Sequence, residues 1–141
     1  MRIYKIASGR TLYHVTHTDR VPSIKKQGLI VNGESNWVSG VGTRYGGDAV
    51  YALENLTDAI LWAAKQDWEF NTKMGSGNIS IVEFQDDDMP WTEDTADPMS
   101  QLGAQGKWLK RVFPVKPDKI TNSYPVTADM IRAASQKRMQ S

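Results

Sequence analysis

LYHVTHTDRVPSIKKQGLI, residues 12–30, places a predicted short strand directly before a predicted short helix. The strand is expected over 12–15, a short stretch that contains aromatic and β-branched residues. The helix is expected over 18–28. Thr18 or Asp19 offers a side-chain oxygen to the unbonded N–H groups at its start, and Gly28 suits a helix end that needs a positive φ.

A glycine-rich segment follows, and regular elements resume after it. Residues 31–47 hold five of the eleven glycines, which predicts a long loop. Loops longer than about 12–15 residues are usually functional or disordered. The later pattern predicts strands at 48–53, 78–84, 108–113 and 120–126, a helix from Asn55 or Thr57 to about Trp68, and a helix at 128–138 capped by Thr127. This order is typical of an α+β fold.

Composition limits the classes of protein to which the chain can belong. Its 141 residues predict one domain, 1–141, and the absence of cysteine excludes disulfides and thiolate chemistry. A net charge of +1 argues against general nucleic-acid coating and against a polybasic membrane binder. The apolar runs are far shorter than the ~20 residues that a bilayer requires, and no signal segment is evident. We therefore expect a cytoplasmic protein.

The sequence predicts no metal site. His14 and His17 are three positions apart on the predicted strand, so their side chains should point to opposite faces. Carboxylates at 86–88 have the ligand type that a divalent cation prefers, but acidic turns of this kind are usually solvated loops. The whole stretch 85–106 is expected to be polar and turn-rich.

Three patterns occur in a fixed order between residues 11 and 62. They are Tyr13-His14-Val15-Thr16-His17 with Gly28-Leu29, then Tyr45-Gly46-Gly47-Asp48-Ala49-Val50-Tyr51-Ala52, then a helix carrying Ala59 and Trp62. The ordered set resembles the ADP-ribosyltransferase fold, in its diphtheria-toxin-like and poly-ADP-ribose-polymerase-like branch. The first block is also similar to DNA-targeting ADP-ribosyltransferase toxins. The resemblance implies a split, mostly antiparallel sheet with short flanking helices.

The resemblance also implies a binding site for NAD+. His14 would donate to a ribose hydroxyl, and Tyr51 would stack on the nicotinamide ring. Trp62, eleven positions further, would supply a second stacking ring. Arg44 in the glycine-rich loop is a candidate contact for the diphosphate. Ala59 replaces a serine that bonds the carboxamide in the polymerases, so one anchor is missing.

The chain departs from the family at the catalytic glutamate that begins the fifth strand. The alignment puts Lys107 or Gln105 there, and an ammonium has the wrong sign to offset positive charge as nicotinamide leaves. Lys107 is instead a candidate contact for the cofactor. Another carboxylate could serve as the catalytic group: Glu83 on the third predicted strand, Glu54, Glu93 or Asp94.

A second interpretation of the missing glutamate is that the reaction does not need one. RNA 2′-phosphotransferases share this fold and use an anionic phosphate as nucleophile, which would suit a positive site built from His14, Arg44, Lys107 and Arg111.

We expect NAD-dependent ADP-ribosylation of a macromolecular acceptor, a protein or a nucleic acid. The alternative is a catalytically inactive domain that binds a nucleotide, or a protein partner as an inhibitor. By analogy, small domains of this kind suit toxins and phage-encoded host-takeover proteins.

Overall fold

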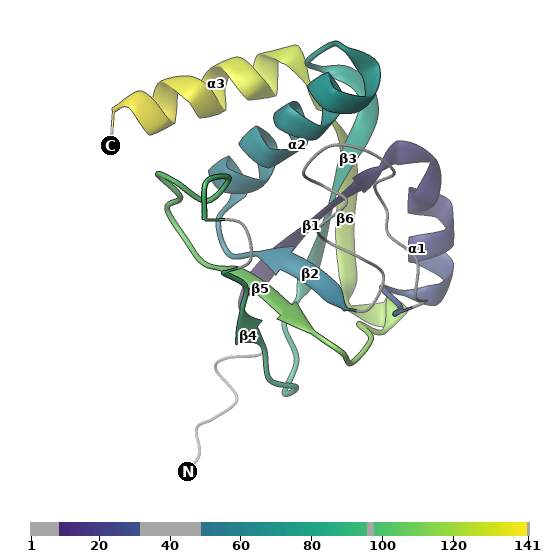
Figure 1. Cartoon of the computed structure of the whole chain (residues 1–141). Coiled ribbons are helices and arrows are strands. Elements are labelled where there is room, and N and C mark those ends of the chain that lie inside the picture. The colour runs from purple at the N-terminus through teal and green to yellow at the C-terminus, as the bar shows by residue number, and fades with distance from the viewer. Residues whose placement is uncertain (1–8, 32–48, 96–97, 141) are drawn as a thin grey trace.

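The structure, a computed structural model, describes residues 9–31, 49–95 and 98–140. Six strands form one antiparallel sheet in the order β4-β5-β2-β1-β3-β6 (Figure 1). The strands are β1 (Thr11–His17), β2 (Val50–Leu53), β3 (Ser76–Gln85), β4 (Thr92–Glu93), β5 (Trp108–Arg111) and β6 (Ile120–Thr127). The helices are α1 (Val21–Gln27), α2 (Leu56–Asn71) and α3 (Ala128–Met139). The predicted α+β class is confirmed.

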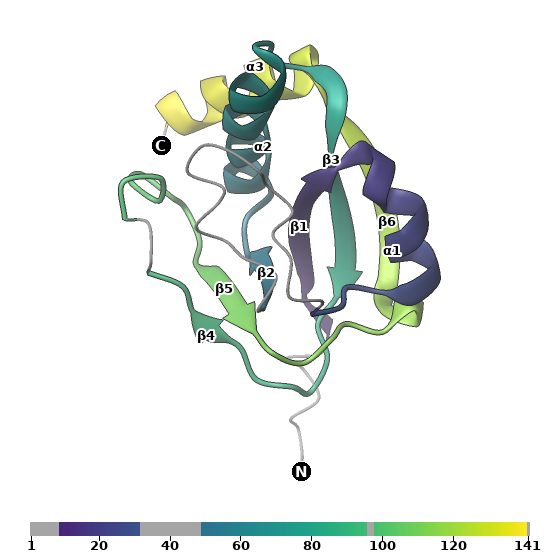
Figure 2. The ribbon, with the colours of Figure 1, turned by 45° about the vertical axis from the view of Figure 1, so that its right-hand side comes forward.

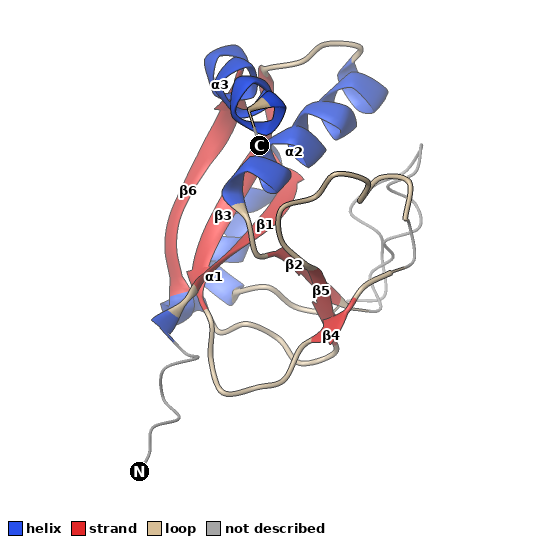
Figure 3. Cartoon of the chain, turned by 90° about the vertical axis from the view of Figure 1, so that its left-hand side faces the viewer, coloured by secondary structure: helices blue, strands red, loops and turns tan. Residues whose placement is uncertain are grey.

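The sheet carries a hydrophobic core on each face. Because successive strand residues point to opposite faces, Val15 joins one cluster and Leu12 the other. The first cluster also contains Ile60 of α2 and Ile131 of α3, and Figure 3 shows these two helices together at one end of the sheet. The second cluster contains Ile24 of α1. The helices therefore cover the two faces unequally, with α2 and α3 on one and α1 on the other.

Helix α2 begins where the sequence predicts and extends further than expected. Asn55 is the cap, and its side-chain oxygen accepts from the backbone N–H of Asp58 at 3.0 Å, a contact typically worth about 1 kcal/mol. The helix continues to Asn71 because buried Asp67 supports its last turn. The Asp67 carboxylate accepts from the Asn71 amide and from both the N–H and the hydroxyl of Ser76. These bonds join the end of the helix to β3.

The first helix is divided, in contrast to the single helix predicted at 18–28. A 3-10 turn spans Thr18–Arg20 before α1, and neither element has a side-chain cap. Thr18 does not cap because its hydroxyl donates to the carbonyl of Gly77 at 2.7 Å. The helix does end at Gly28 with φ 81°, as predicted. A Cβ at this position would lie 2.0 Å from the Val115 carbonyl oxygen.

The sheet divides between β1 and β2. Strand β1 pairs with β3 at every residue from Thr11 to His17, whereas its register with β2 contains the single pair Tyr13 and Leu53. The two strands diverge beyond that pair (Figure 2). One half of the sheet is β4-β5-β2 and the other is β1-β3-β6.

Several strand boundaries differ from the prediction, and one strand was not predicted. Strand β5 ends at Arg111 and not at 113, because the Arg111 side chain bonds the carbonyls of Phe113 and Pro114 and curls the chain there. Strand β4 was not predicted, since two exposed polar residues carry no alternation signal. The strand expected at 48–53 begins at Val50, and position 48 lies outside the described residues. None of the helices in the described ranges has the length and apolar character needed to cross a membrane.

Candidate functional site

His14 connects the two halves of the divided sheet. Its Nδ1 lies 2.7 Å from the carbonyl oxygen of Tyr51 on β2. A carbonyl only accepts, so Nδ1 carries the hydrogen. Burial lowers the pKa of His14, the bond to the Tyr51 carbonyl partly opposes this, and the charge of Arg20 lowers the pKa further. The ring is therefore neutral near pH 7, and its Nε2 is a hydrogen-bond acceptor.

The side chain of Tyr51 lines an open pocket. Tyr51 of β2 pairs with Lys110 of β5, which pairs in turn with Thr92 of β4, so the three side chains form one row on the same face of the sheet. The pocket has a volume of about 330 Å³. Its described lining consists of Ala49, Tyr51, Pro90, Thr92, Lys110, Arg111, Val112 and Phe113.

The described lining of this pocket carries positive charge. Lys110 makes no ion pair within the described part of the chain, and no carboxylate is among the described lining residues. A second cation held ~6 Å from the Lys110 ammonium would be repelled by about 3 kcal/mol at an effective dielectric constant of 20. That exceeds the ~0.5–2 kcal/mol that a cation gains on an aromatic face. The pocket therefore favours a neutral or anionic group beside Tyr51.

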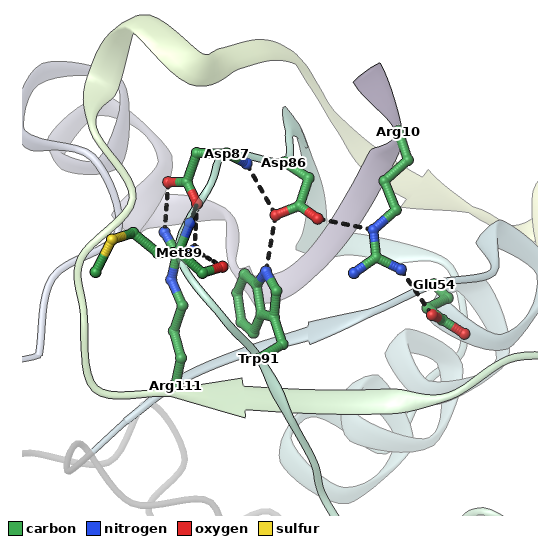
Figure 4. A network of polar contacts seen from close by, with 7 residues as sticks. All are labelled: Arg10, Glu54, Asp86, Asp87, Met89, Trp91 and Arg111. Carbon is green, nitrogen blue, oxygen red and sulfur yellow. Dashed lines mark hydrogen bonds and ion pairs between the residues drawn. The ribbon is translucent and has the colours of Figure 1, made fainter. Parts of the chain in front are cut away.

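Arg111 also lines the pocket, but its guanidinium is fully engaged elsewhere (Figure 4). It forms two bonds to the Asp87 carboxylate, at 2.6 and 2.8 Å, and lies 4.4 Å from the centre of the Trp91 ring. Its remaining donors bond the carbonyls of Met89, Phe113 and Pro114. The hydrogen bonds from Arg111 to the Asp87 carboxylate lower the pKa of Asp87, against the effect of burial. Arg111 thus shapes the pocket wall and has no N–H left for a phosphate.

The acidic segment at 86–88 is part of the same polar network. Asp86 is buried and accepts from the Trp91 indole N–H and from Arg10, both at 2.8 Å. Arg10 also bonds Glu54 at 2.8 Å, as Figure 4 shows. The prediction of a solvated acidic turn is wrong for Asp86, because its charge is matched by Arg10 and buried under Trp91.

Trp62 is not among the described residues that line the Tyr51 pocket. It is 7% exposed and packs edge to face against Trp108, with ring centroids 4.9 Å apart. It lines a smaller pocket of about 160 Å³ together with Asp58, Lys65, Ser100 and Arg138, among others. Trp62 and Tyr51 share the hydrophobic cluster under α2, but the two rings line different pockets.

Glu83 lies on the other half of the sheet. It is the register partner of Tyr13, and its carboxylate accepts a short hydrogen bond from the Tyr124 hydroxyl. Burial raises the pKa of Tyr124, and the negative charge of Glu83 raises it further. Glu83 is not among the described residues that line the Tyr51 pocket. Its assignment as the catalytic carboxylate stays a prediction.

Residues 105–107 form a bend held by a carboxylate of α2 and by the carboxylate that follows β2. Asp58 accepts from the backbone N–H groups of Gln105 and Gly106 and from Arg138. Glu54 accepts from the backbone N–H of Lys107 at 2.8 Å. The Lys107 side chain is exposed and is not among the described residues that line the Tyr51 pocket. Its contact with a cofactor stays a prediction.

Two predicted features have no structural description. Arg44 and the glycine-rich loop that carries it lie outside the described residues.

Within the described ranges, no three histidine, aspartate or glutamate side chains gather as a metal site requires.

Sequence reasoning missed the residue that gives the pocket its charge. Lys110 occupies a strand position next to the catalytic-glutamate alignment, where attention falls on Lys107. The signal that could have found it is the pairing of β2 with β5, because that register places Lys110 directly opposite Tyr51. A pairing between strands about 60 residues apart is not readable from local pattern.

Comparison with known proteins finds no family model that matches the chain and no curated protein with significant similarity to it.

Proposed function

We propose that this domain binds NAD+ where β1 and β2 diverge and transfers its ADP-ribose to a macromolecular acceptor. The observation that carries the proposal is the hydrogen bond from buried His14 to the Tyr51 carbonyl, which links the split in the sheet to an open pocket. The order of motifs between residues 11 and 62 supplies the link to ADP-ribosyltransferases.

His14 would position the nucleotide by accepting a hydrogen bond. Nδ1 is committed to the Tyr51 carbonyl, so a ribose hydroxyl would donate to Nε2. This is the reverse of the donor role that the resemblance implies. The lowered pKa keeps the ring neutral and Nε2 able to accept at neutral pH.

In the transfer step, the bond between C1′ of the nicotinamide ribose and the ring nitrogen breaks, and its electron pair leaves with neutral nicotinamide. A nucleophilic oxygen or nitrogen of the acceptor bonds to C1′, and a neutral nucleophile loses its proton to solvent. The described pocket lining holds no carboxylate that could stabilise the cationic transition state. An acceptor whose nucleophile is already anionic would need the least assistance.

Release of nicotinamide from NAD+ is the test of transfer. His14→Asn keeps a donor near the position of Nδ1 and removes the Nε2 acceptor, whereas His14→Ala removes both. We expect release to fall at least about tenfold in each variant, while the melting temperature falls less for His14→Asn. Unchanged release in His14→Asn, or none from the unaltered protein with any protein or nucleic-acid acceptor, contradicts the proposal.

The charge of Lys110, which has no ion-pair partner among the described residues, favours a second candidate, a domain that binds a nucleotide without cleaving it. A positive lining attracts the phosphates of NAD+ or ADP-ribose, and the described lining holds no carboxylate to stabilise the cationic transition state of cleavage. This candidate predicts that ADP-ribose raises the melting temperature while NAD+ stays intact. Cleavage of NAD+ by the purified protein would exclude it.

A further inference from the structure

We propose that the pocket beside Tyr51 holds the adenylate half of the nucleotide, with Lys110 as the anchor for its phosphate. The resemblance would place the cationic nicotinamide ring there instead. The inference rests on the proposed function only in taking a nucleotide as the ligand.

The walls of the pocket suit a planar base. Tyr51 and Phe113 are aromatic, Pro90 is apolar, and all three line the same space. Phe113 is 43% exposed, so a bound ring would cover apolar surface that now faces solvent. A base of any identity is stabilised by stacking on an aromatic side chain.

Lys110 gives this space a preference for anions. It is the register partner of Tyr51 and faces the pocket from the neighbouring strand. The other cation in the described lining, Arg111, is paired with Asp87 and has its N–H groups bonded within the protein. The hydroxyl of Thr92, the next residue in the row, can donate to a phosphate oxygen.

The size of the pocket agrees with half a dinucleotide. Ligand pockets usually measure about 300–1,000 Å³, and 330 Å³ is near the lower limit. A base, a ribose and one phosphate fit this space better than a complete NAD+. The pocket also opens at the same strand whose carbonyl binds His14, so the other half of the nucleotide would continue toward the split.

Calorimetric titration of the full chain with AMP, adenosine and nicotinamide riboside tests the inference. We expect AMP to bind at least tenfold more tightly than adenosine, and nicotinamide riboside not to compete with AMP. Lys110→Gln should weaken AMP binding about tenfold and abolish its dependence on salt. Lys116→Gln, which alters an exposed lysine outside the pocket, is the matched control and should bind AMP as the unaltered protein does.

Two outcomes overturn the inference: equal affinities for AMP and adenosine, or equal affinity of Lys110→Gln and the unaltered protein for AMP. Failure of the proposed function is separable from these. If AMP binds through Lys110 but NAD+ is never cleaved, the transferase proposal fails and the adenylate pocket stands. If NAD+ is cleaved with the same KM in Lys110→Gln, the adenylate pocket fails and the transferase proposal stands.

Discussion

The imidazole Nδ1 of His14 donates to the main-chain carbonyl of Tyr51 at 2.7 Å, across a junction where β1 and β2 share one register pair. In a continuous sheet, backbone hydrogen bonds would join β1 and β2 at this point. Here a hydrogen bond from the His14 side chain takes their place. The contact joins the two halves of the sheet and fixes Nδ1 as the nitrogen that carries the hydrogen. Structure and proposed function therefore depend on the same hydrogen bond.

The first prediction concerns stability at mildly acidic pH. The pKa of His14 is lowered in the folded state, so below the unfolded value of about 6.5 the unfolded chain binds a proton that the folded chain does not. The free energy of unfolding should fall as pH decreases from 7 to 5, by at most about 1.4 kcal/mol per pH unit. Urea unfolding at pH 7, 6 and 5 measures this.

His14→Asn is the control for that experiment. It removes the titrating group and leaves His17 in place, so the difference between the two proteins isolates His14. The variant should lose less stability than the unaltered protein over the same pH range. Parallel curves for the two proteins would show that His14 does not titrate with a lowered pKa.

The second prediction concerns the pair of Asp87 and Arg111. The Arg111 side chain is 2% exposed, and removal of its partner leaves a buried charge with only carbonyl acceptors. Asp87→Ala should lower the free energy of unfolding by about 3 kcal/mol. Asp129→Ala breaks the exposed pair with Arg132 and should change it little. Equal effects of the two substitutions, measured by urea unfolding, would refute a special role for the buried pair.

The same pair predicts acid sensitivity in a lower pH window. Bonds from Arg111 hold the pKa of Asp87 below its ordinary value of 3.8. The stability that this provides is complete above about pH 4–5 and is lost as pH falls through the folded pKa. Stability curves between pH 5 and 2 should therefore fall more steeply for the unaltered protein than for Asp87→Asn. The opposite order would contradict the geometry.

The third prediction compares two glycines with positive φ. Gly28 has φ 81° and Gly77 has φ 87°, so alanine is strained at both. A Cβ at Gly28 would also collide with the Val115 carbonyl at 2.0 Å, whereas one at Gly77 meets nothing within 4 Å. Gly28→Ala should be less stable than Gly77→Ala by about 1–3 kcal/mol in urea unfolding. Similar losses would mean that α1 does not approach Val115 this closely.

Much of the fold was predictable from local signals. The Asn55 and Thr127 caps and the Gly28 stop were correct because each acts through bonds within a few residues of itself. Thr18 failed as a cap because its hydroxyl donates to Gly77, some 59 positions away. Tertiary contacts of that kind leave no trace in local pattern.

The candidate site was only partly predictable, for the same reason. The pattern singled out His14 and Tyr51, and the structure joins them. It also singled out Trp62 and Glu83, which are not among the described residues that line the Tyr51 pocket, and their roles stay predictions. The position of Lys110 opposite Tyr51 depends on the register between β2 and β5. The hydrogen bonds that engage Arg111 depend on how residues 86–91 fold. Both are tertiary features that local sequence patterns do not encode.

Chemical-shift mapping with NAD+ is the most direct test of where the nucleotide binds. On addition of NAD+ to the isotope-labelled full chain, we predict that shifts concentrate on the amides of 49–52 and 110–113 and on the His14 ring. These are the residues of the pocket and of the junction beside it. An unchanged spectrum at saturating NAD+, or shifts confined to β6 and α3, would contradict binding at this junction.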